Sequence, residues 1–299
     1  MSETVIALGF FDGVHLGHAA LLRRAVEEAK IRNAVSAIFT FDRTPKEVVT
    51  GKPCPLINSP QDRADLARRL YGIREVITAP FDQRMMTTPW DEFIPSLIER
   101  FHAVHLIAGH DHKFGYLNAG NPELLAQKCA ELNIGCDIIS PITIGGEIVS
   151  SSHIRELLQS GDVENANSFL GHPHVLTQEV RHGNQIGRSM GIPTMNFIPP
   201  FNVLIPARGV YISVVVLPDG TRCPGVTNIG VRPTIHDGEQ ITIETWLLNF
   251  DGDLYGRRVR LEFRRRLRDE ISFPSLEDLQ RQILIDADQA RLWFREHPM

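Results

Sequence analysis

Cysteine is scarce in this chain of 299 residues, and its spacing carries no functional signal. The four cysteines form no CxxC pair and no dense framework; they are Cys54, Cys129, Cys136 and Cys223. Disulfide-stabilised secreted modules and zinc ribbons both need closely spaced cysteines. The spacing therefore excludes both classes and fits reduced thiols.

Long apolar runs are also absent. The apolar run at the start, residues 1–11, is too short to span a membrane, and it lacks a basic beginning and a small-residue cleavage site. A hydrophobic content of 42% still provides the material for packed cores, which excludes global disorder. We therefore expect a soluble, cytoplasmic protein that has no membrane partner.

No excess of positive charge marks the chain as a nucleic-acid-binding protein. The net charge is −5, and the part from residue 171 onward carries 15 basic and 15 acidic residues. Seven arginines nevertheless fall within residues 257–268, so a nucleic-acid surface has to be considered. Val259, Leu261 and Phe263 alternate there with polar residues, which favours a strand with one buried face and one solvated face. On this basis we expect no nucleic-acid partner.

The first half of the chain alternates strands and helices. Short apolar stretches predict strands at residues 5–8, 35–41, 75–79, 104–108 and 136–139. Three helix starts combine a capping residue with a proline, at Ser59-Pro60, Thr88-Pro89 and Asn121-Pro122. This alternation is typical of an α/β fold with a doubly wound parallel sheet.

The second half has a different texture. A short helix is predicted over residues 162–170, and Gly171 begins the break that follows it. Beyond it, stretches separated by turns predict strands at residues 175–180, 210–217, 222–229, 241–248 and 257–263. Ser275 begins a final helix with Asp278 in its capping box. We therefore predict two domains, residues 1–170 and residues 171–299, the second mostly antiparallel β with one closing helix.

The most informative motif is GFFDGVHLGH at residues 9–18, which runs from the first predicted strand into the first helix. Its glycines permit a tight turn, and the amides at a helix start form a site for anionic phosphate. His15 and His18 can aim imidazole donors at a triphosphate, and Gly17 permits close approach of the ligand. The alternative for either histidine is a helix cap or a packed core residue.

Nucleotidyl transfer is the chemistry that suits this motif. Fixed donors can match the negative charge that spreads over the phosphate oxygens during in-line attack on the α-phosphorus of a nucleoside triphosphate. The Walker pattern GxxxxGK[ST] is absent from the chain, which disfavours ordinary P-loop phosphotransfer.

Two more motifs follow predicted strands at the same edge of the sheet. GHDHKFG occupies residues 109–115, and SSSHIR occupies residues 150–155, where hydroxyls can cap a helix and Arg155 can reach phosphate. Zinc binding is an alternative suggested by four nearby histidines, His102, His105, His110 and His112. Their spacing matches no compact ligand set, so contacts with a ligand are the favoured interpretation.

In the second half, GRSMGIPTMN at residues 187–196 joins a glycine loop to a Pro-Thr-x-Asn sequence. Thr194 and Asn196 lie two residues apart on an extended segment and point the same way, which suits oxygen ligation of Mg²⁺ beside a nucleotide. Both are also ordinary turn residues. Glu244 in a β stretch could act as a general base, or it could be an exposed strand carboxylate.

Taken together, these motifs resemble the family of bifunctional bacterial riboflavin kinases and FAD synthetases. The similarity spans nearly the whole chain and comprises GFFDGVHLGH, GHDHKFG, SSSHIRELLQSGD, GRSMGIPTMNF, GVY, GVTNIGVRPT, ETWLLNFDGDLYG, LRDEISF and DADQAR. The resemblance implies an N-terminal FMN adenylyltransferase domain of the nucleotidyltransferase type and a C-terminal riboflavin kinase domain built on a small antiparallel β-barrel. It also implies ATP as co-substrate, Mg²⁺ as cofactor, and riboflavin, FMN and FAD as substrates or products.

The resemblance further implies roles for individual residues. His15 and His18 would hold the ATP phosphates of adenylyl transfer, and Glu244 would accept the proton of the riboflavin 5′-hydroxyl. Thr194 and Asn196 would meet magnesium and ATP, and Arg268 would lie near the flavin. The other residues expected to bind ATP or phosphate are Gly9, Phe10, Phe11, Asp12, Gly17, Asp111, Ser151, Ser152 and Arg155 in the first domain, and Gly187, Gly191 and Pro193 in the second.

The chain departs from the family's usual pattern at three places in the first domain. Arg43-Thr44-Pro45 stands where the family usually has Pro-His-Pro, Phe10 where it often has Asn, and His112-Lys113 where Phe-Arg is frequent. Two alternatives stay open: a riboflavin kinase with a weak or altered adenylyltransferase, and a flavin-responsive nucleic-acid-binding regulator that uses the arginines of residues 257–268. Assembly into a homo-oligomer is left open.

Overall fold

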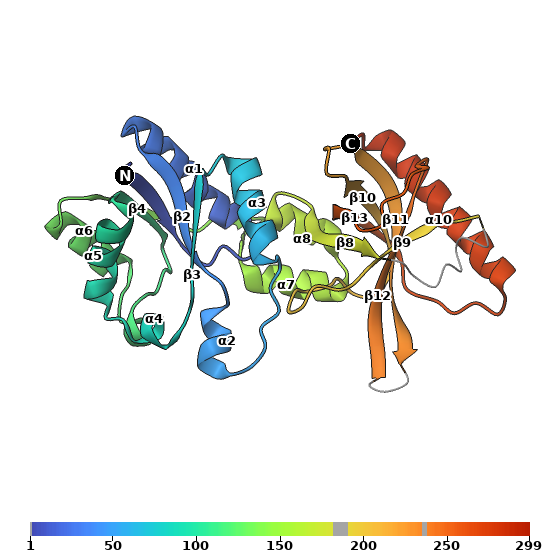
Figure 1. Ribbon diagram of the computed structural model, residues 1–299, viewed down its shortest axis with the longest axis horizontal. Coiled ribbons are helices and arrows are strands. Elements are labelled where there is room, and N and C mark those ends of the chain that lie inside the picture. The colour runs from blue at the N-terminus through green and yellow to red at the C-terminus, as the bar shows by residue number, and fades with distance from the viewer. Residues whose placement is uncertain (1, 182–190, 235–237) are drawn as a thin grey trace. The chain divides into compact units, whose positions relative to one another are not determined.

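The computed structural model describes residues 2–181, 191–234 and 238–299, and its backbone separates into two units (Figure 1). The first unit contains residues 1–56 and 60–151, and the second contains residues 57–59 and 152–299. Two helices that precede the expected boundary, α7 (Ser151–Ser160) and α8 (Val163–Leu170), therefore group with the second unit from Ser152 onward. The functional boundary at residue 170 remains a prediction.

A five-stranded parallel sheet forms the centre of the first unit. Its strand order is β3-β2-β1-β4-β5. The strands are β1 (Thr4–Leu8), β2 (Val35–Phe41), β3 (Glu75–Ala79), β4 (Ala103–Gly109) and β5 (Gly135–Ile139). The five strands predicted from the sequence are confirmed to within one residue at each end. The order also shows that β1 lies between β2 and β4, so the sheet reverses its winding direction at β1.

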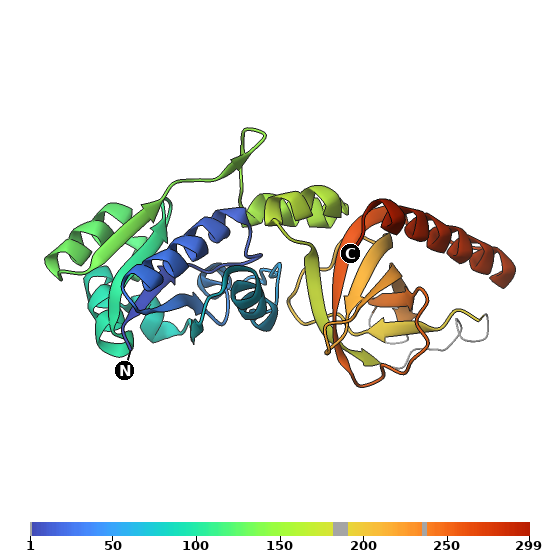
Figure 2. The ribbon, with the colours of Figure 1, turned by 90° about the horizontal axis from the view of Figure 1, so that it is seen from above.

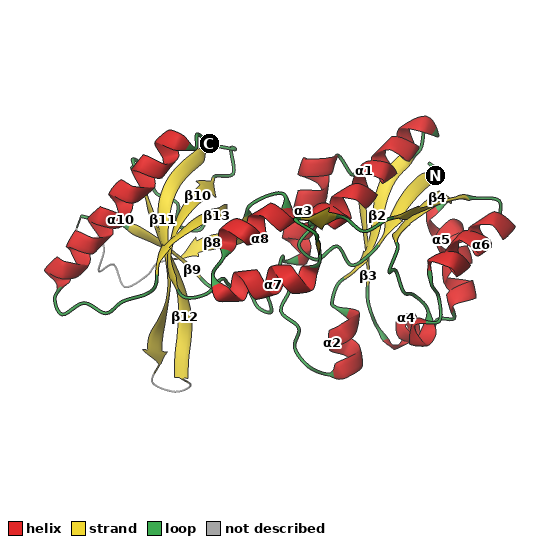
Figure 3. Ribbon diagram, turned by 180° about the vertical axis from the view of Figure 1, so that it is seen from behind, coloured by secondary structure: helices red, strands yellow, loops and turns green. Residues whose placement is uncertain are grey.

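Helices cover both faces of this sheet. On one face α1 (Leu16–Ile31) packs along β1 and β2 and touches α3 (Pro60–Tyr71), and Figure 2 shows α1 running along the strands. On the other face lie α5 (Trp90–Phe101) and α6 (Pro122–Glu131). The connections carry two short helices, α2 (Pro45–Thr50) and α4 (Gln83–Thr87) (Figure 3). They also carry the 3₁₀ turn Tyr116–Asn118 and a hairpin of β6 (Thr143–Ile144) and β7 (Glu147–Ile148). The sequence predicted none of these elements.

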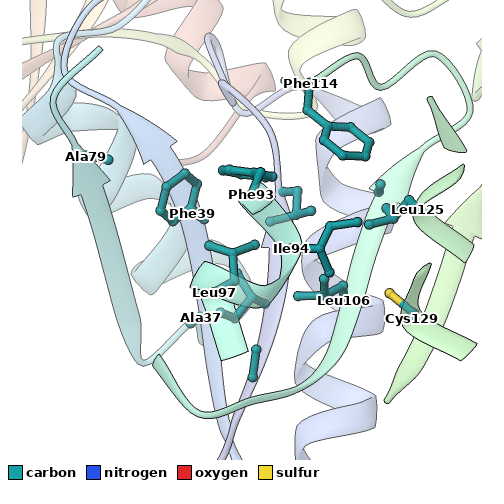
Figure 4. Close-up of a cluster of buried hydrophobic side chains, with 14 residues drawn as sticks. Ala37, Phe39, Ala79, Phe93, Ile94, Leu97, Leu106, Phe114, Leu125 and Cys129 are labelled. Atoms are coloured by element: carbon teal, nitrogen blue, oxygen red, sulfur yellow. The ribbon is translucent and has the colours of Figure 1, made fainter. Parts of the chain in front are cut away.

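Buried apolar side chains fill the space between the sheet and the helices α5 and α6. Phe93, Ile94 and Leu97 of α5 point toward the sheet, where they meet Phe39 of β2 and Leu106 of β4 (Figure 4). Leu97 is only 1% exposed. This cluster packs one face of the sheet against α5 and α6. The packing fixes the positions of the strands and so of their carboxyl ends.

The helix starts test the capping predictions. Asn121 Oδ1 accepts the backbone N–H of Leu124 at 2.8 Å, and Ser275 Oγ accepts that of Asp278 at 3.1 Å, which confirms both caps. The prediction for Thr88 is wrong: α5 has Pro89 as its N-cap, and the Thr88 hydroxyl donates to the Arg84 carbonyl at 2.8 Å. Thr88 ends α4, a helix that the sequence did not predict.

A closed antiparallel barrel of six strands forms the centre of the second unit. The strand order is β10-β11-β12-β9-β8-β13. The strands are β8 (His174–Arg181), β9 (Thr194–Phe197), β10 (Gly209–Val216), β11 (Arg222–Thr234), β12 (Gly238–Leu247) and β13 (Arg258–Arg268). The five predicted strands are present. The short β9 is a sixth strand, formed by the segment around Thr194 and Asn196 that the sequence predicted to be extended.

The barrel strands carry a buried cluster of three hydroxyls on their inner face and an apolar patch under a helix on their outer face. Inside, the Thr227 hydroxyl bonds to Ser213 at 2.7 Å and to Thr245 at 2.8 Å, and all three residues are fully buried. Outside, the closing helix α10 (Leu276–Glu296) buries Ala287 and Ala290 against β10 and β11. Residues of β11 and β12 alternate between these two environments, as in any strand.

We predict that Leu97→Ala destabilises the first unit by about 2–5 kcal/mol, because the substitution leaves a cavity between α5 and the sheet. Hydrogen–deuterium exchange of peptides from β1 and β4 measures this change locally. The control is Leu117→Ala, since Leu117 is 80% exposed, and its effect should stay within about 0.5 kcal/mol. Equal exchange rates in the Leu97 variant and the wild type would contradict the packing described above.

Candidate functional site

The first candidate site is the loop between β1 and α1. Because β1 lies between β2 and β4, the loops that follow β1 and β4 diverge from neighbouring positions at the carboxyl edge of the sheet. A crevice between such loops is where open α/β sheets bind ligands. The motif at residues 9–18 follows β1 and the motif at residues 109–115 begins at the end of β4. The fold therefore brings these two predicted motifs to one edge.

The backbone of the loop after β1 is held in a rare conformation. Phe11, Gly13 and Val14 have φ angles of 56°, 86° and 44°, which lie in the region that residues other than glycine seldom adopt. Phe11 and Val14 are fully buried, so packing holds both of them in place. The Ser151 hydroxyl donates to the Asp12 carbonyl at 2.9 Å. Ser151 thus contacts the backbone of the loop, and its contact with ATP or phosphate stays a prediction.

His15 and His18 form one stacked pair at the start of α1. His15 is the N-cap, and its Nδ1 accepts the backbone N–H of His18 at 3.3 Å. The two rings lie 3.6 Å apart and nearly parallel. Gly17 allows this arrangement, since a Cβ there would lie 3.1 Å from the His15 ring. His15 is therefore both a helix cap, as the alternative interpretation held, and part of the predicted pair.

Burial and neighbouring charges both lower the pKa of His18. Burial, followed by the charges of His15 and Arg63, holds the pKa of His18 well below its ordinary value, so the ring is neutral at pH 7. In the described part of the chain, the buried Nδ1 of His18 has no hydrogen-bond partner. A neutral imidazole can still donate one N–H to a phosphate oxygen, and a bound polyanion favours its protonation.

The motif after β4 contributes polar groups of two kinds. Asp111 is exposed, and its carboxylate lies 4.0 Å from His110 Nδ1. His112 instead stacks on Phe114 with ring centroids 5.6 Å apart, and burial lowers the pKa of His112 to about 4. His112 is consequently a neutral packed ring that cannot replace a cationic side chain, whereas Asp111 is available at the surface.

Some predicted residues of the first site serve the local structure. Thr44 is buried and caps α2, where its Oγ1 accepts the backbone N–H of Glu47 at 2.9 Å. Gly9 is needed next to the Phe11 ring, which would lie 3.2 Å from a Cβ at that position. Ser152 and Arg155 continue the helix that begins at Ser151, but they group with the second unit. Their role at the phosphate site remains a prediction.

The histidines that suggested zinc serve different purposes. His105 lies on β4, is 3% exposed, and its Nε2 lies 3.0 Å from Asp137 Oδ2. His102 ends α5 as its C-cap. Among residues 2–181, 191–234 and 238–299, no group of three or more His, Cys, Asp or Glu side chains could hold a metal ion. The zinc alternative therefore finds no support in this part of the chain.

The second candidate site lies on the barrel, where three strands bring polar residues together. Glu244 of β12 is paired directly with Asn196 of β9 on one side and with Asn228 of β11 on the other. Directly paired residues of antiparallel strands have Cβ atoms about 5 Å apart and share one face of the sheet. Asn228 was not predicted, although it lies in the glycine-bracketed segment GVTNIGVRPT that the sequence singled out.

A cavity of about 400 Å³ adjoins these strands. Pro193, Thr194 and Asn196 line it, together with the turn at residues 250–255. That turn adds the carboxylates of Asp251 and Asp253, so the groups here are oxygen donors of the kind that Mg²⁺ prefers. Gly191 lies just before this segment with a φ of 71°. The predicted Gly187 lies outside the described residues.

Arg268, predicted to lie near the flavin, is held by the closing helix. Its Nη2 lies 2.7 Å from the Asp286 carboxylate, and its Nε bonds to both oxygens of the same group. Asp286 is 2% exposed and also accepts a bond from Gln282 at 2.9 Å. The guanidinium carbon lies 5.9 Å from the centre of the Phe273 ring. Arg268 thus fixes the segment between β13 and α10, and its contact with flavin stays a prediction.

The face of β13 expected to be solvated is solvated only in part, since Arg258 is exposed but Arg260 is half-buried. Glu262, predicted to lie on that face, is only 4% exposed. Its carboxylate pairs with Arg222 at 2.8 Å, Arg260 at 3.2 Å and Arg264 at 2.6 Å. Burial alone would raise the pKa of Glu262, but the arginines, Arg264 first, hold it below its ordinary value. Their charge is therefore partly neutralised within the protein, which weakens the case for a nucleic-acid surface.

We predict that Glu262→Gln destabilises the second unit by about 3 kcal/mol at pH 7, because it leaves three half-buried arginines without their buried carboxylate. Since the pKa of Glu262 is lowered on folding, its contribution exists above the unfolded pKa and is lost as pH falls through the folded pKa. Urea unfolding at pH 7 and at about pH 3 measures both effects. The difference from the wild type should shrink at the lower pH.

The exposed Glu296 provides the matched control. Glu296→Gln should change the free energy of unfolding by less than about 0.5 kcal/mol. A Glu262 variant as stable as the wild type at pH 7 would mean that the three arginines do not depend on this carboxylate.

Comparisons with known proteins assign a family model to each half of the chain. A family model described as FAD synthetase matches residues 1–153, and one described as riboflavin kinase matches residues 170–294. A protein of Escherichia coli K12 named bifunctional riboflavin kinase/FMN adenylyltransferase is 38% identical over 97% of this chain and 92% of its own length. A protein of the same name from Haemophilus influenzae is 34% identical over 97% and 94%.

A solved structure shares the fold across both units. A crystal structure described as a macrolide-efflux protein from Streptococcus pneumoniae matches 97% of this chain and 94% of its own, with a TM-score of 0.86 and 28% sequence identity. Within the residues that the structure describes, no helix is both long enough and apolar enough to cross a membrane.

Proposed function

This chain belongs to the family of bifunctional riboflavin kinases/FMN adenylyltransferases, and from that premise we propose how its residues divide the two reactions. ATP-dependent phosphorylation of riboflavin yields FMN, and adenylylation of FMN yields FAD and pyrophosphate. The observation that carries the proposal is the separation of the two residue sets, His15 and His18 on the parallel sheet and Thr194, Asn196 and Glu244 on the barrel.

In the first unit, the phosphate of FMN attacks the α-phosphorus of ATP. The new bond joins an FMN phosphate oxygen to that phosphorus, and the bond to the bridging oxygen of pyrophosphate breaks. His15, His18 and the backbone amides at the start of α1 donate to the oxygens on which charge accumulates. No protein nucleophile is needed. The stacking of His15 on His18 supports this role, as does the buried Nδ1 of His18, which has no hydrogen-bond partner among the described residues.

In the second unit, the riboflavin 5′-hydroxyl attacks the γ-phosphorus of ATP, and ADP leaves. Glu244 accepts the hydroxyl proton as the oxygen attacks. Thr194 and Asn196 would hold Mg²⁺, which neutralises charge on the nucleotide phosphates when bound. The oxygen donors lining the 400 Å³ cavity fit that ion. Asn196 and Asn228 flank Glu244 and orient its carboxylate.

The remaining alternatives find less support. The regulator hypothesis relied on the arginines of residues 257–268, of which Arg260 and Arg264 pair with Glu262, and Arg268 with Asp286. The alternative of a weak adenylyltransferase relied on Thr44, Phe10 and His112; of these, Thr44 caps α2 and His112 is a neutral packed ring. We include Mg²⁺ dependence and a cytoplasmic location in the proposal, since both reactions consume ATP.

The direct test is to incubate the protein with riboflavin, ATP and Mg²⁺ and to separate the flavins by chromatography. The proposal expects FMN to accumulate first and FAD to follow. Supplying FMN with ATP should give FAD without riboflavin. FMN that never proceeds to FAD would instead favour the kinase with an altered first unit.

We predict that replacing His15 and His18 by Ala together abolishes FAD formation from supplied FMN and leaves riboflavin phosphorylation near the wild-type rate. Both histidines lie in the first unit, and each lost phosphate donor is worth roughly 100-fold in turnover. Phosphorylation of riboflavin in the same sample reports that the second unit is folded. Loss of both activities in a folded variant would contradict the two-site division.

We predict that Glu244→Gln lowers riboflavin phosphorylation by about 100-fold, since the amide keeps the shape of the side chain and removes its basicity. The affinity for riboflavin should change little. Glu179→Gln on β8 is the control, because Glu179 is an exposed strand carboxylate of the same barrel. Normal turnover of the Glu244 variant at neutral pH would mean that Glu244 is a strand carboxylate without a role in catalysis, like Glu179.

A further inference from the structure

A buried arginine, whose charge also lowers the pKa of His18, lies against the loop after β1. Arg63 of α3 is 1% exposed and is one of the largest fully buried side chains. Its Nη1 donates to the Phe10 carbonyl and, at 3.1 Å, to Thr40 Oγ1. Its Nη2 donates to the Phe41 carbonyl at 3.0 Å. One guanidinium therefore joins the loop to the end of β2.

The same guanidinium also stacks on the loop. Its central carbon lies 4.4 Å from the centre of the Phe10 ring, a cation–π contact made in a desolvated setting. Phe10 is one of the positions where this chain departs from the usual sequence pattern of the family, which often has Asn there. Both the ring and the carbonyl of Phe10 are thus held by a single side chain.

Burying a cation in this way is costly, which makes a purely packing role a poor explanation. Burial lowers the pKa of Arg63 to about 10, although the charges of Asp12 and Asp42 oppose the shift. The side chain stays protonated at neutral pH. An apolar residue could fill the same volume without the desolvation cost, but only a planar fork can donate to several acceptors at once.

The Phe10 carbonyl, which accepts from Arg63, lies just before the part of the loop that has positive φ angles. Phe10 immediately precedes Phe11, the first residue of the loop with a positive φ. Thr40 reinforces the contact, since its own hydroxyl donates to the Phe10 carbonyl at 2.8 Å. With Phe10 fixed to the end of β2, the chain has to turn through Phe11, Gly13 and Val14 before α1 begins at Leu16.

We propose that Arg63 is the positioning residue of the adenylyl-transfer site: its fork holds the Phe10 carbonyl against β2 and so sets the backbone on which His15 and His18 stand. This inference rests on the proposed function of the first unit. Arg63 acts through the loop and does not touch the substrate. A displacement of about 1 Å in such a scaffold can cost about 100-fold in rate.

The test uses the full chain and three substitutions that affect the contact in different ways. Arg63→Met removes the charge and the fork. Arg63→Lys keeps a buried cation but cannot bridge the three acceptors. Thr40→Val removes one hydroxyl with little change of shape. Arg68→Met is the matched control, because Arg68 lies on the same helix and is exposed.

Turnover of FMN to FAD is measured at saturating ATP and FMN, well below the unfolding temperature, where a residue that only adds stability would leave kcat unchanged. We expect a fall of about 100-fold for Arg63→Met and about 10-fold for Arg63→Lys. Thr40→Val should lower kcat by about 3-fold, the scale of one lost hydrogen bond. Arg68→Met should have no effect, and riboflavin phosphorylation should be unchanged in all four.

The outcomes separate this inference from the function it rests on. Wild-type turnover in Arg63→Lys and Thr40→Val, even with a lower unfolding temperature, overturns the positioning role while FAD synthesis stands. A wild-type chain that makes no FAD overturns both. If Arg63→Met does not fold, Arg63→Lys and Thr40→Val decide the question by themselves.

Discussion

The backbone between β1 and α1 has to pass through two residues other than glycine at positive φ, and the first site depends on that constraint. Phe11 and Val14 would not hold this conformation alone, because it costs each of them about 1 kcal/mol or more. Contacts from three distant segments hold the loop: Arg63 and Thr40 bind the Phe10 carbonyl, and Ser151 binds the Asp12 carbonyl. The histidine pair begins α1 directly after this loop.

A second regularity is that several buried carboxylates are paired with arginines, in both units. Arg24 and Arg32 pair with Glu28 on α1, where His105 lies close by. In the barrel, Glu262 pairs with three arginines and Asp286 with Arg268. Each of these groups would be costly to bury alone. In the order of the closed barrel, β10 and β8 lie between the arginine-rich strand β13 and the three strands β9, β11 and β12.

The sequence predicts the strands and the main motifs well, because they depend on local patterns. β2 and β3 begin and end where alternation of apolar residues and turn signals place them. The edge position of the loop after β1 follows from the parallel order alone. Thr194, Asn196 and Glu244 could be selected from residue type and motif, and the strand register then shows that two of them are direct neighbours.

The features that the sequence does not predict depend on contacts between distant segments. Arg63 lies 53 positions from the carbonyl it holds, and nothing in its local pattern distinguishes it from Arg68. Glu262 alternates like a surface residue, yet arginines on its own strand and on β11 cover it. Thr88 matches a helix cap, but it ends the preceding α4, and its carbonyl accepts the Tyr116 N–H at 2.7 Å.

The central claim is that two separate ATP sites exist, one on the parallel sheet and one on the barrel. Calorimetric titration of the full chain with a non-hydrolysable ATP analogue in the presence of Mg²⁺ tests it most directly. The account predicts that the wild type binds two analogue molecules per chain, and that the variant with Ala at both His15 and His18 binds one. A single site in the wild type, or two undiminished sites in the variant, would contradict it.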